Sequence, residues 1–279
     1  MGLKQKIKKA VQGGIKLFKQ KNVVPVYKIT ENSKLLENKV ALVSGGSRGI
    51  GYGIAKSLIE CGCKVIISGT NENKLKDSCA KLGESCKYIV LNVLDVNSMY
   101  SKIEKASKLF EGNNKIDILV NSAGVHGNQH FIDVTEETYD SVLDVNLKGS
   151  FFMTQNMAKF MIKNKIKGHI LNVSSSSALK PAWTPYEISK WGVRGFTQGA
   201  SSALIKHGIV VNAIAPGPVA TEMLGRSEGD TLYLDDNPTK RFATTEEIGQ
   251  LAAYMVSDLC NLVIGDTFYI SGGSGVITK

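Results

Sequence analysis

The sequence lacks any apolar run long enough to cross a bilayer, which takes about 20 residues, and its N-terminus lacks the apolar core of a secretory signal. Its five cysteines are odd in number, and they include neither a Cys-x-x-Cys pair nor histidines at zinc-site spacing. Internal repeats and low-complexity tracts are also missing. These absences argue against a membrane-spanning protein, a disulfide-stapled scaffold and a structural zinc site. We therefore expect a cytoplasmic protein with reduced thiols and no metal.

The length and the placement of charge predict one domain with an appendage. A chain of 279 residues is long enough for a large domain with a substantial core. The net charge is +9, and residues 1 to 39 alone carry ten lysines against two glutamates. The rest of the chain is nearly neutral, so the excess charge belongs to the appendage. We therefore do not expect nucleic acid as a partner.

Residues 1 to 37 are predicted to form a basic N-terminal extension, before a domain at residues 38 to 279. Apolar residues recur there at roughly helical spacing among the lysines: Leu3, Ile7, Val11, Ile15 and Phe18. This pattern indicates an amphipathic helix that rests on an anionic membrane surface or binds a protein. The alternative is a terminal helix that packs on its own domain or on another subunit, or that frays.

From residue 39 onward, short apolar runs alternate with helical patterns. The predicted strands are Val40 to Ser44, Lys64 to Ser68, Tyr88 to Asn92, Ile116 to Asn121, Ile170 to Ser174, Val210 to Ala215 and Thr267 to Ile270. The segments between them are long enough for crossover helices. The alternation therefore predicts an α/β fold with a doubly wound, Rossmann-like parallel sheet. Ligands of such sheets bind at the carboxyl ends of the strands.

Two residues near position 190 have the spacing of an acid–base pair. Tyr186 and Lys190 follow Pro185 and lie four residues apart, so a helix beginning there places them on one face. A neighbouring ammonium group lowers the pKa of a tyrosine from its usual value near 10, and such a tyrosine can exchange a proton with a substrate. The serines at 174 to 177 offer a hydroxyl nearby. Since solvated helix faces often show the same spacing, the pair needs support from elsewhere.

A glycine-rich turn supplies that support. The first predicted strand runs directly into Ser44-Gly45-Gly46-Ser47-Arg48-Gly49-Ile50-Gly51, and a helical pattern follows. Glycines in such a turn let the backbone approach a phosphate closely, and the N-terminus of the next helix then faces the phosphate. The arrangement of strand, turn and helix therefore indicates a nucleotide site.

These motifs, with others in the same order, resemble the classical short-chain dehydrogenase/reductase family over residues 38 to about 275. The motifs of the family appear here as Ser44 to Gly51, Asn121-Ser122-Ala123-Gly124, Asn146, Ser175, Tyr186 to Lys190, and Pro216-Gly217. The resemblance implies an oxidoreductase that interconverts a carbonyl and a secondary alcohol by hydride transfer with NAD(P). A 3-oxoacyl compound and a sugar or polyol are the expected substrate types.

The resemblance also implies a role for each matching residue. Tyr186 would be the general acid and base, and Lys190 would lower its pKa and hold the nicotinamide ribose. Ser175 would orient the substrate carbonyl, and Asn146 would support a water path from Lys190 to solvent. Ser174 is the alternative to Ser175, because the serine-to-tyrosine spacing of 11 residues is about two shorter than the family pattern. The implied cofactor contacts are Gly45, Ser47, Arg48, Gly49, Ile50, Gly51, Thr70, Asn92, Asn121, Ala123, Gly124, Tyr186, Lys190, Pro216, Gly217, Val219 and Thr221.

The end of the second predicted strand indicates which cofactor is preferred. An acid there would bond the ribose hydroxyls of NAD, but this chain has Ser68-Gly69-Thr70-Asn71. No carboxylate repels a 2′-phosphate at this place, and Arg48 can supply a cation. The sequence therefore favours NADP(H) over NAD(H). A surface salt bridge is the alternative interpretation of Arg48.

The helices that contain Asn146 and Tyr186 resemble those through which members of the family form homodimers and homotetramers.

The alternative function is an NADP(H)-binding scaffold or sensor without turnover, which docks through residues 1 to 37. The presence of Tyr186, Lys190, Asn146 and nearby serines argues against this alternative. His126 and His130 are left outside the predicted site, because a lone loop histidine is more often solvated.

Overall fold

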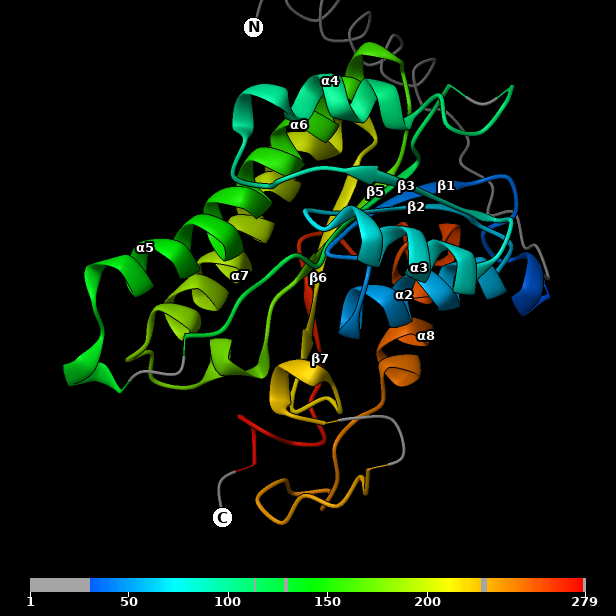
Figure 1. Cartoon of the computed structure of the whole chain (residues 1–279). Helices are drawn as coiled ribbons and strands as arrows, with labels where there is room; N and C mark the ends of the chain where they lie inside the picture. The colour runs from blue at the N-terminus through cyan, green and yellow to red at the C-terminus, as the bar shows by residue number, and fades with distance from the viewer. Residues whose placement is uncertain (1–30, 113, 128–129, 227–229, 278–279) are drawn as a thin grey trace, which may run out of the picture. The chain divides into compact units, whose positions relative to one another are not determined.

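Seven parallel strands form one sheet in the order β3-β2-β1-β4-β5-β6-β7 (Figure 1). The strands are β1 (Val40–Ser44), β2 (Lys64–Gly69), β3 (Cys86–Val90), β4 (Ile118–Asn121), β5 (His169–Val173), β6 (Val210–Pro216) and β7 (Thr267–Ile270). The chain winds outward from β1 to β3, and then returns so that β4 pairs with the other side of β1. The predicted doubly wound α/β fold is confirmed.

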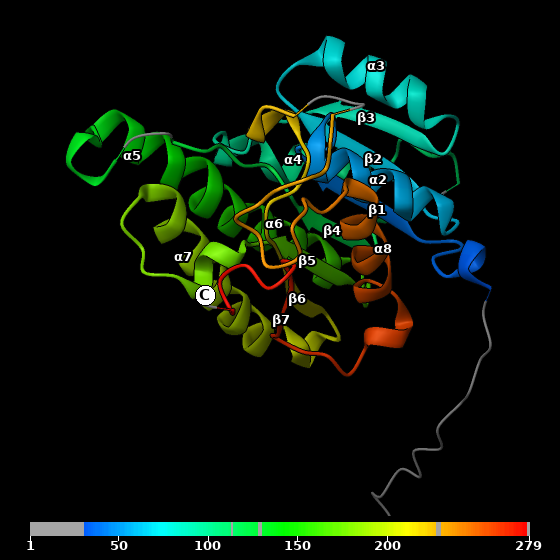
Figure 2. The same cartoon turned by 90° about the horizontal axis from the view of Figure 1, so that it is seen from below.

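Helices cover both faces of this sheet (Figures 1 and 2). They are α2 (Gly49–Glu60), α3 (Glu72–Leu82), α4 (Val96–Ala106), α5 (Glu136–Leu143), α6 (Ser150–Lys163), α7 (Pro185–Leu204) and α8 (Thr245–Met255). Because successive side chains of a strand point to opposite faces, Ala41 and Val43 of β1 join the core under α2 and α8, whereas Val40 and Leu42 join the core under α4 and α6. Burial on both faces explains the nearly continuous apolar runs of the strands.

The point where the strand order reverses lies between β1 and β4. Ser44 pairs in register with Asn121, so the two strands end side by side. The glycine turn leaves β1 there, and the segment beginning at Ser122 leaves β4. In an open sheet of this kind, the crevice between such diverging connections is where a ligand binds.

Five strands differ from their predicted bounds: β2 and β6 end one residue later, β4 begins two residues later, β5 is shifted by one residue, and β3 is shifted by two. β3 spans Cys86–Val90, two residues earlier than the predicted run from Tyr88 to Asn92. Cys86 pairs with Val65 of β2, and the chain leaves the sheet after Val90. Asn92 lies in the turn that follows, where its side-chain oxygen accepts a hydrogen bond from the backbone N–H of Leu94 (3.0 Å). Sequence hydropathy alone does not show where a turn of this kind ends the pairing.

The structure, a computed structural model, describes residues 31 to 112, 114 to 127, 130 to 226 and 230 to 277. The predicted amphipathic helix, whose apolar residues run from Leu3 to Phe18, lies outside these ranges, so its contact with a membrane or a protein stays a prediction. The predicted domain boundary at residue 38 also stays a prediction. Leu36 is fully buried in the core of the domain. No helix in the described ranges is long and apolar enough to cross a membrane.

Candidate active site

A cavity of about 510 Å³ runs along the carboxyl ends of the strands. Its size is typical of a site for a cofactor or another small molecule. Sixteen of the predicted site residues line it: Gly45, Ser47, Arg48, Gly49, Ile50, Gly51, Thr70, Asn92, Ala123, Gly124, Ser175, Tyr186, Lys190, Pro216, Gly217 and Thr221. The fold therefore brings the glycine turn and the tyrosine–lysine pair, which are far apart in sequence, into one cavity.

The glycine turn packs so closely on its neighbours that side chains are excluded. Gly45 has a φ of +66°, and a Cβ there would lie 2.8 Å from the Cα of Ala123. The hydroxyl oxygen of Ser44 accepts hydrogen bonds from the backbone N–H groups of Ser122 (3.1 Å) and Ala123 (3.2 Å). Helix α2 begins at Gly49 without a side-chain cap on its first N–H groups. A bare backbone cradle at a helix N-terminus fits a phosphate group.

Gly51 offers a test of this cradle. A Cβ at Gly51 would meet the carbonyl oxygen of Gly45, so Gly51→Ala must displace the turn. We expect a loss of about 1 to 3 kcal/mol in the free energy of unfolding and at least tenfold weaker binding of NADPH, measured by denaturant titration and calorimetry. Gly199→Ala on α7 is the control, because its Cβ would meet no described atom within 4 Å. Native-like cofactor affinity in Gly51→Ala would contradict the assignment of the cradle.

The start of α7 holds Tyr186 and Lys190 in place. Thr184 caps the helix and forms a capping box with Glu187, and Pro185 occupies the first turn. The carboxylate of Glu187 also accepts a hydrogen bond from the backbone N–H of Trp183 (2.9 Å). Tyr186 and Lys190 share one face of the helix, and the lysine Nζ lies 5.5 Å from the centroid of the tyrosine ring. This geometry agrees with the four-residue spacing.

The pKa of Tyr186 differs from the expectation. Burial raises the pKa of the phenol above its usual value, and a hydrogen bond with Ser175 opposes this rise. The ammonium group of Lys190 donates to the backbone carbonyl of Val173 (2.9 Å). The structure thus does not show the predicted lowering of the tyrosine pKa by Lys190. The sequence identified the pair, but it did not reveal how far the fold removes both groups from water.

Lys190 is itself strongly affected by burial. Its side chain is 6% exposed, and burial lowers its pKa from 10.5 to about 8. Between these two values the unfolded chain binds more protons than the folded chain, so the stability of the folded protein rises with pH. Each pH unit contributes about 1.4 kcal/mol. From pH 8 to 10.5, the free energy of unfolding of the wild type should therefore gain about 3 kcal/mol relative to that of Lys190→Met.

Urea titrations of the two proteins at several pH values measure this difference. The comparison cancels the titration of all other groups, provided that both proteins keep the same fold. A difference that does not change with pH would mean that Lys190 keeps its charge well above pH 8.

The two candidate serines face different partners. The hydroxyl of Ser174 donates to the backbone carbonyl of Lys190 (3.0 Å), which ties β5 to α7. The hydroxyl of Ser175 lies beside the phenol of Tyr186 and accepts a hydrogen bond from the N–H of Ser177 (3.1 Å). A short 3₁₀ helix, Ser176–Leu179, occupies the shortened connection. The geometry therefore favours Ser175 as the serine that faces a substrate at Tyr186.

Three predicted residues lie outside the lining of the cavity: Asn121, Asn146 and Val219. The amide nitrogen of Asn121 donates to Thr154 (2.9 Å) and to Asn172 (2.9 Å), so this side chain points into the core rather than toward a cofactor. Val219 is 2% exposed.

Asn146 acts on the site through the segment that follows β4. It lies in a π-helical turn, Asp144–Gly149, between α5 and α6. Its side chain accepts a hydrogen bond from the N–H of Val125 (2.8 Å) and donates one to the carbonyl of Val125 (3.0 Å) and to Ser189 (3.1 Å). π-Turns within helices are frequent at functional sites. Asn146 thus fixes the strand-end segment next to Tyr186.

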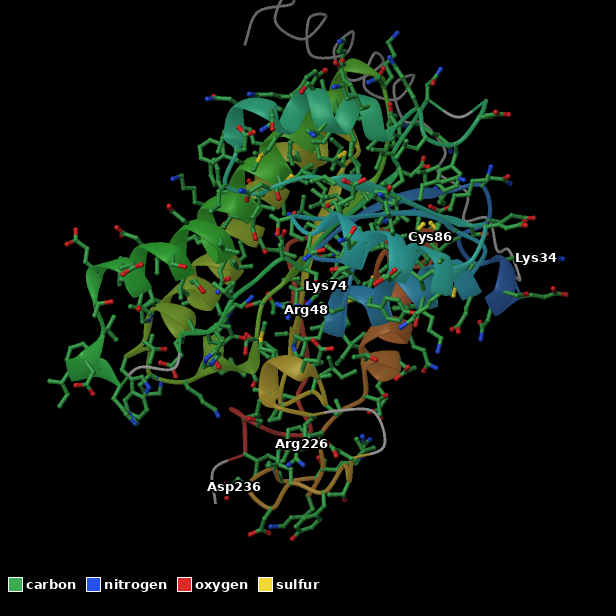
Figure 3. All side chains as sticks on the ribbon, viewed as in Figure 1. Lys34, Arg48, Lys74, Cys86, Arg226 and Asp236 are labelled. Carbon is green, nitrogen blue, oxygen red and sulfur yellow. The ribbon has the colours of Figure 1, made fainter. Side chains whose placement is uncertain are left out.

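Three residues of this region are absent from the predicted site: Lys74 and Glu222, and His126, which was considered and left outside. Lys74, in the first turn of α3, lines the cavity together with Arg48; both side chains are labelled in Figure 3. Glu222 also lines the cavity, and its carboxylate lies 3.7 Å from Arg48 in an exposed ion pair, which agrees with the alternative interpretation of that arginine. The ring of His126 lies 4.4 Å from that of Tyr186, centroid to centroid. Two of them had a signal in the sequence: Lys74 lies just after the second strand, and His126 follows the Asn121-Ser122-Ala123-Gly124 motif.

Comparisons with known proteins agree with this geometry. Residues 39–231 match the model of the family described as short chain dehydrogenase. The chain is 35% identical to galactitol 2-dehydrogenase of Agrobacterium fabrum, with 86% of this chain and 98% of that enzyme covered. It is 33% identical to the 3-oxoacyl-[acyl-carrier-protein] reductase FabG of Aquifex aeolicus, with 85% and 98% covered.

A solved structure resembles the whole domain. The gluconate 5-dehydrogenase of Burkholderia cenocepacia, determined in complex with NADP and tartrate, superposes with a TM-score of 0.79 at 27% identity. The match covers 88% of this chain and 99% of that enzyme. In the described ranges, no cluster of three or more His, Cys, Asp or Glu side chains has the geometry of a metal site.

Proposed function

Because the chain belongs to the short chain dehydrogenase family and is an oxidoreductase of that family, we propose that it interconverts a carbonyl and a secondary alcohol with NADP(H), using Tyr186 as general acid and base. One observation carries this proposal. The glycine cradle, which is the turn from Gly45 to Gly51, and the group of Ser175, Tyr186 and Lys190 line the same cavity. A cradle for a phosphate and a proton donor at one site are what a nicotinamide-dependent reduction needs.

Each side chain has a task in this reaction. The bound nicotinamide supplies hydride in reduction and accepts it in oxidation. Tyr186 gives its proton to the carbonyl oxygen in reduction and takes it back in oxidation, and its raised pKa keeps the phenol protonated at neutral pH. Ser175 donates a second hydrogen bond to the same oxygen. Lys190 places a positive charge near the phenol, which favours the phenolate that forms when the proton leaves.

Preference for NADP(H) is supported by the charges around the ribose end of the cavity. Arg48 and Lys74 both line it, and the Gly69-Thr70-Asn71 segment after β2 carries no carboxylate. Asn71 caps α3 through a hydrogen bond to the N–H of Lys74 (3.0 Å), which fixes the start of that helix. A 2′-phosphate there would meet two cations. Glu222 competes for Arg48 across an exposed gap of 3.7 Å, where ion pairs contribute little.

The substrate class rests on the relatives. Galactitol 2-dehydrogenase and gluconate 5-dehydrogenase are named for a polyol and a sugar acid, which supports a sugar or polyol substrate for this chain. The FabG enzymes are named for 3-oxoacyl compounds, which supports the second candidate. Both classes react at a secondary alcohol or ketone, so the site described above serves either.

The proposal is tested by titrating the purified protein with NADPH and NADH, and then by following cofactor absorbance over a panel of ketoses, sugar acids and a 3-oxoacyl thioester. We expect tighter binding of NADPH and turnover that depends on Tyr186. Binding of cofactor without turnover of any compound would favour the NADP(H)-binding scaffold. Failure to bind either cofactor would contradict the assignment of the glycine cradle.

We also propose that copies of this chain associate through α5, α6 and α7. Large apolar side chains are exposed on these neighbouring helices: Tyr139, Phe151, Ile188 and Trp191. Such a group of exposed side chains is typical of an interface between subunits. Light scattering should give the mass of a dimer or tetramer, and Phe151→Lys should lower it. A monomeric wild-type protein would contradict the proposal.

A further inference from the structure

His126 touches the proposed proton donor from a side that nothing else in the proposed mechanism uses. Its imidazole ring lies 4.4 Å from the ring of Tyr186, with an angle of 40° between the ring planes. The His126 side chain is exposed, whereas Tyr186 is half-buried. An exposed ring that packs on the proposed proton donor can contact a substrate that binds there.

The two neighbours of the tyrosine ring lie at different depths. Lys190 is buried, and its ammonium group donates to the carbonyl of Val173 inside the domain. His126 is open to solvent and lies outside the lining of the cavity. The cavity extends from Tyr186 along the glycine cradle, which leaves the solvent side of the phenol for the substrate. His126 borders this solvent side.

The position of His126 is also fixed by the fold. The preceding residue, Val125, exchanges two backbone hydrogen bonds with the side chain of Asn146, at 2.8 and 3.0 Å. Gly124 before it packs against the same amide, because a Cβ there would lie 3.3 Å from the Asn146 oxygen. A side chain held by such a support can position a substrate group with the accuracy that selectivity needs.

From this geometry we propose that His126 determines substrate specificity by hydrogen bonding a hydroxyl on the carbon next to the one that reacts. Tyr186 and Ser175 hold the reacting oxygen, and an oxygen on the adjacent carbon lies on the side where the imidazole stands. An imidazole nitrogen can form one hydrogen bond with such a hydroxyl. The substrates of the site are then α-hydroxy ketones and the vicinal diols that they give.

This inference rests on the proposed function and separates its two candidate substrate classes. A ketose or polyol carries a hydroxyl beside the reacting carbon. A 3-oxoacyl thioester carries only CH2 or CH3 carbons beside its ketone, so it gains nothing from the imidazole. A site built to bond a substrate hydroxyl discriminates against the analogue that lacks it. His126 thus favours the sugar or polyol class.

The test uses 3-hydroxybutan-2-one and butan-2-one, which differ in one hydroxyl, as substrates with NADPH. The measured quantity is the ratio of kcat/KM for the hydroxy ketone to that for the plain ketone. We expect the wild type to favour the hydroxy ketone. In His126→Ala and in His126→Phe this ratio should fall about tenfold, because each variant loses one hydrogen bond to the substrate. His126→Asn should keep part of the preference, and His130→Ala, from the same loop, is the matched control.

The phenylalanine variant separates specificity from packing. It keeps an aromatic ring against Tyr186 but has no N–H group, so a ratio that survives in His126→Phe and falls in His126→Ala would overturn the proposal. A wild type without preference for the hydroxy ketone, or one that turns over neither ketone, would overturn it as well. Turnover of any other carbonyl compound that is lost in Tyr186→Phe would still uphold the proposed function.

Discussion

Replacing Tyr186 by phenylalanine is expected to lower kcat/KM for carbonyl reduction by about 10³-fold. The variant keeps the ring and loses only the hydroxyl group, and with it the proton to be transferred; a positioned general acid contributes about 10² to 10⁴ in rate. The ring contacts with Lys190 and His126 do not involve the hydroxyl, so the fold and the cofactor cavity should persist. Affinity for NADPH, measured by calorimetry, should stay within about threefold of the wild-type value. The effect should therefore appear in turnover and not in binding.

Tyr88→Phe is the matched control for this experiment. The hydroxyl of Tyr88 donates to Glu72 at the surface (3.3 Å) and lies away from the cavity, so activity should not change with its loss. If Tyr186→Phe kept more than a tenth of wild-type kcat/KM while binding NADPH normally, another group would have to donate the proton. The exposed His126 beside the ring would then be the first candidate.

Local patterns in the sequence were enough to predict the sheet and the glycine cradle. The bounds of β1 and β7 agree with the predicted strands residue for residue, because an apolar run with turn residues at its end carries its own boundaries. β3 moved by two residues, because Cys86 and Lys87 pair with β2 without belonging to the apolar run. The cradle was predictable because its chemistry depends on glycines that are contiguous in the chain.

What the sequence did not show depends on contacts between distant segments. The strand position of Asn121 suggested a cofactor contact, but its amide points toward Thr154 and Asn172 in the core. His126 meets Tyr186 only because the segment that follows β4 packs beside the start of α7. The pKa of Tyr186 likewise follows from how much water the fold removes, and no spacing in the chain encodes that quantity.

Removing the two cations that line the ribose end of the cavity is expected to change the preference for NADPH over NADH. In the double variant Arg48→Ala/Lys74→Ala, we expect the ratio of the NADH to the NADPH dissociation constants to fall by about 10²-fold or more. Both side chains line the cavity where the ribose end of the cofactor would lie, and a hydrogen bond to a charged group contributes about 1.5 to 3 kcal/mol. NADH lacks the 2′-phosphate, so its affinity should change little.

Single variants and a control from the same helix locate this effect. Lys76 on α3 pairs with Glu72 (3.2 Å) and does not line the cavity, so Lys76→Ala removes the same charge without touching the proposed phosphate site. Glu222→Gln frees Arg48 from its carboxylate partner and should strengthen NADPH binding modestly, because that ion pair is exposed. Equal losses of NADPH and NADH affinity in the double variant would mean that the two cations bind the pyrophosphate, and the preference for NADP(H) would lose its physical basis.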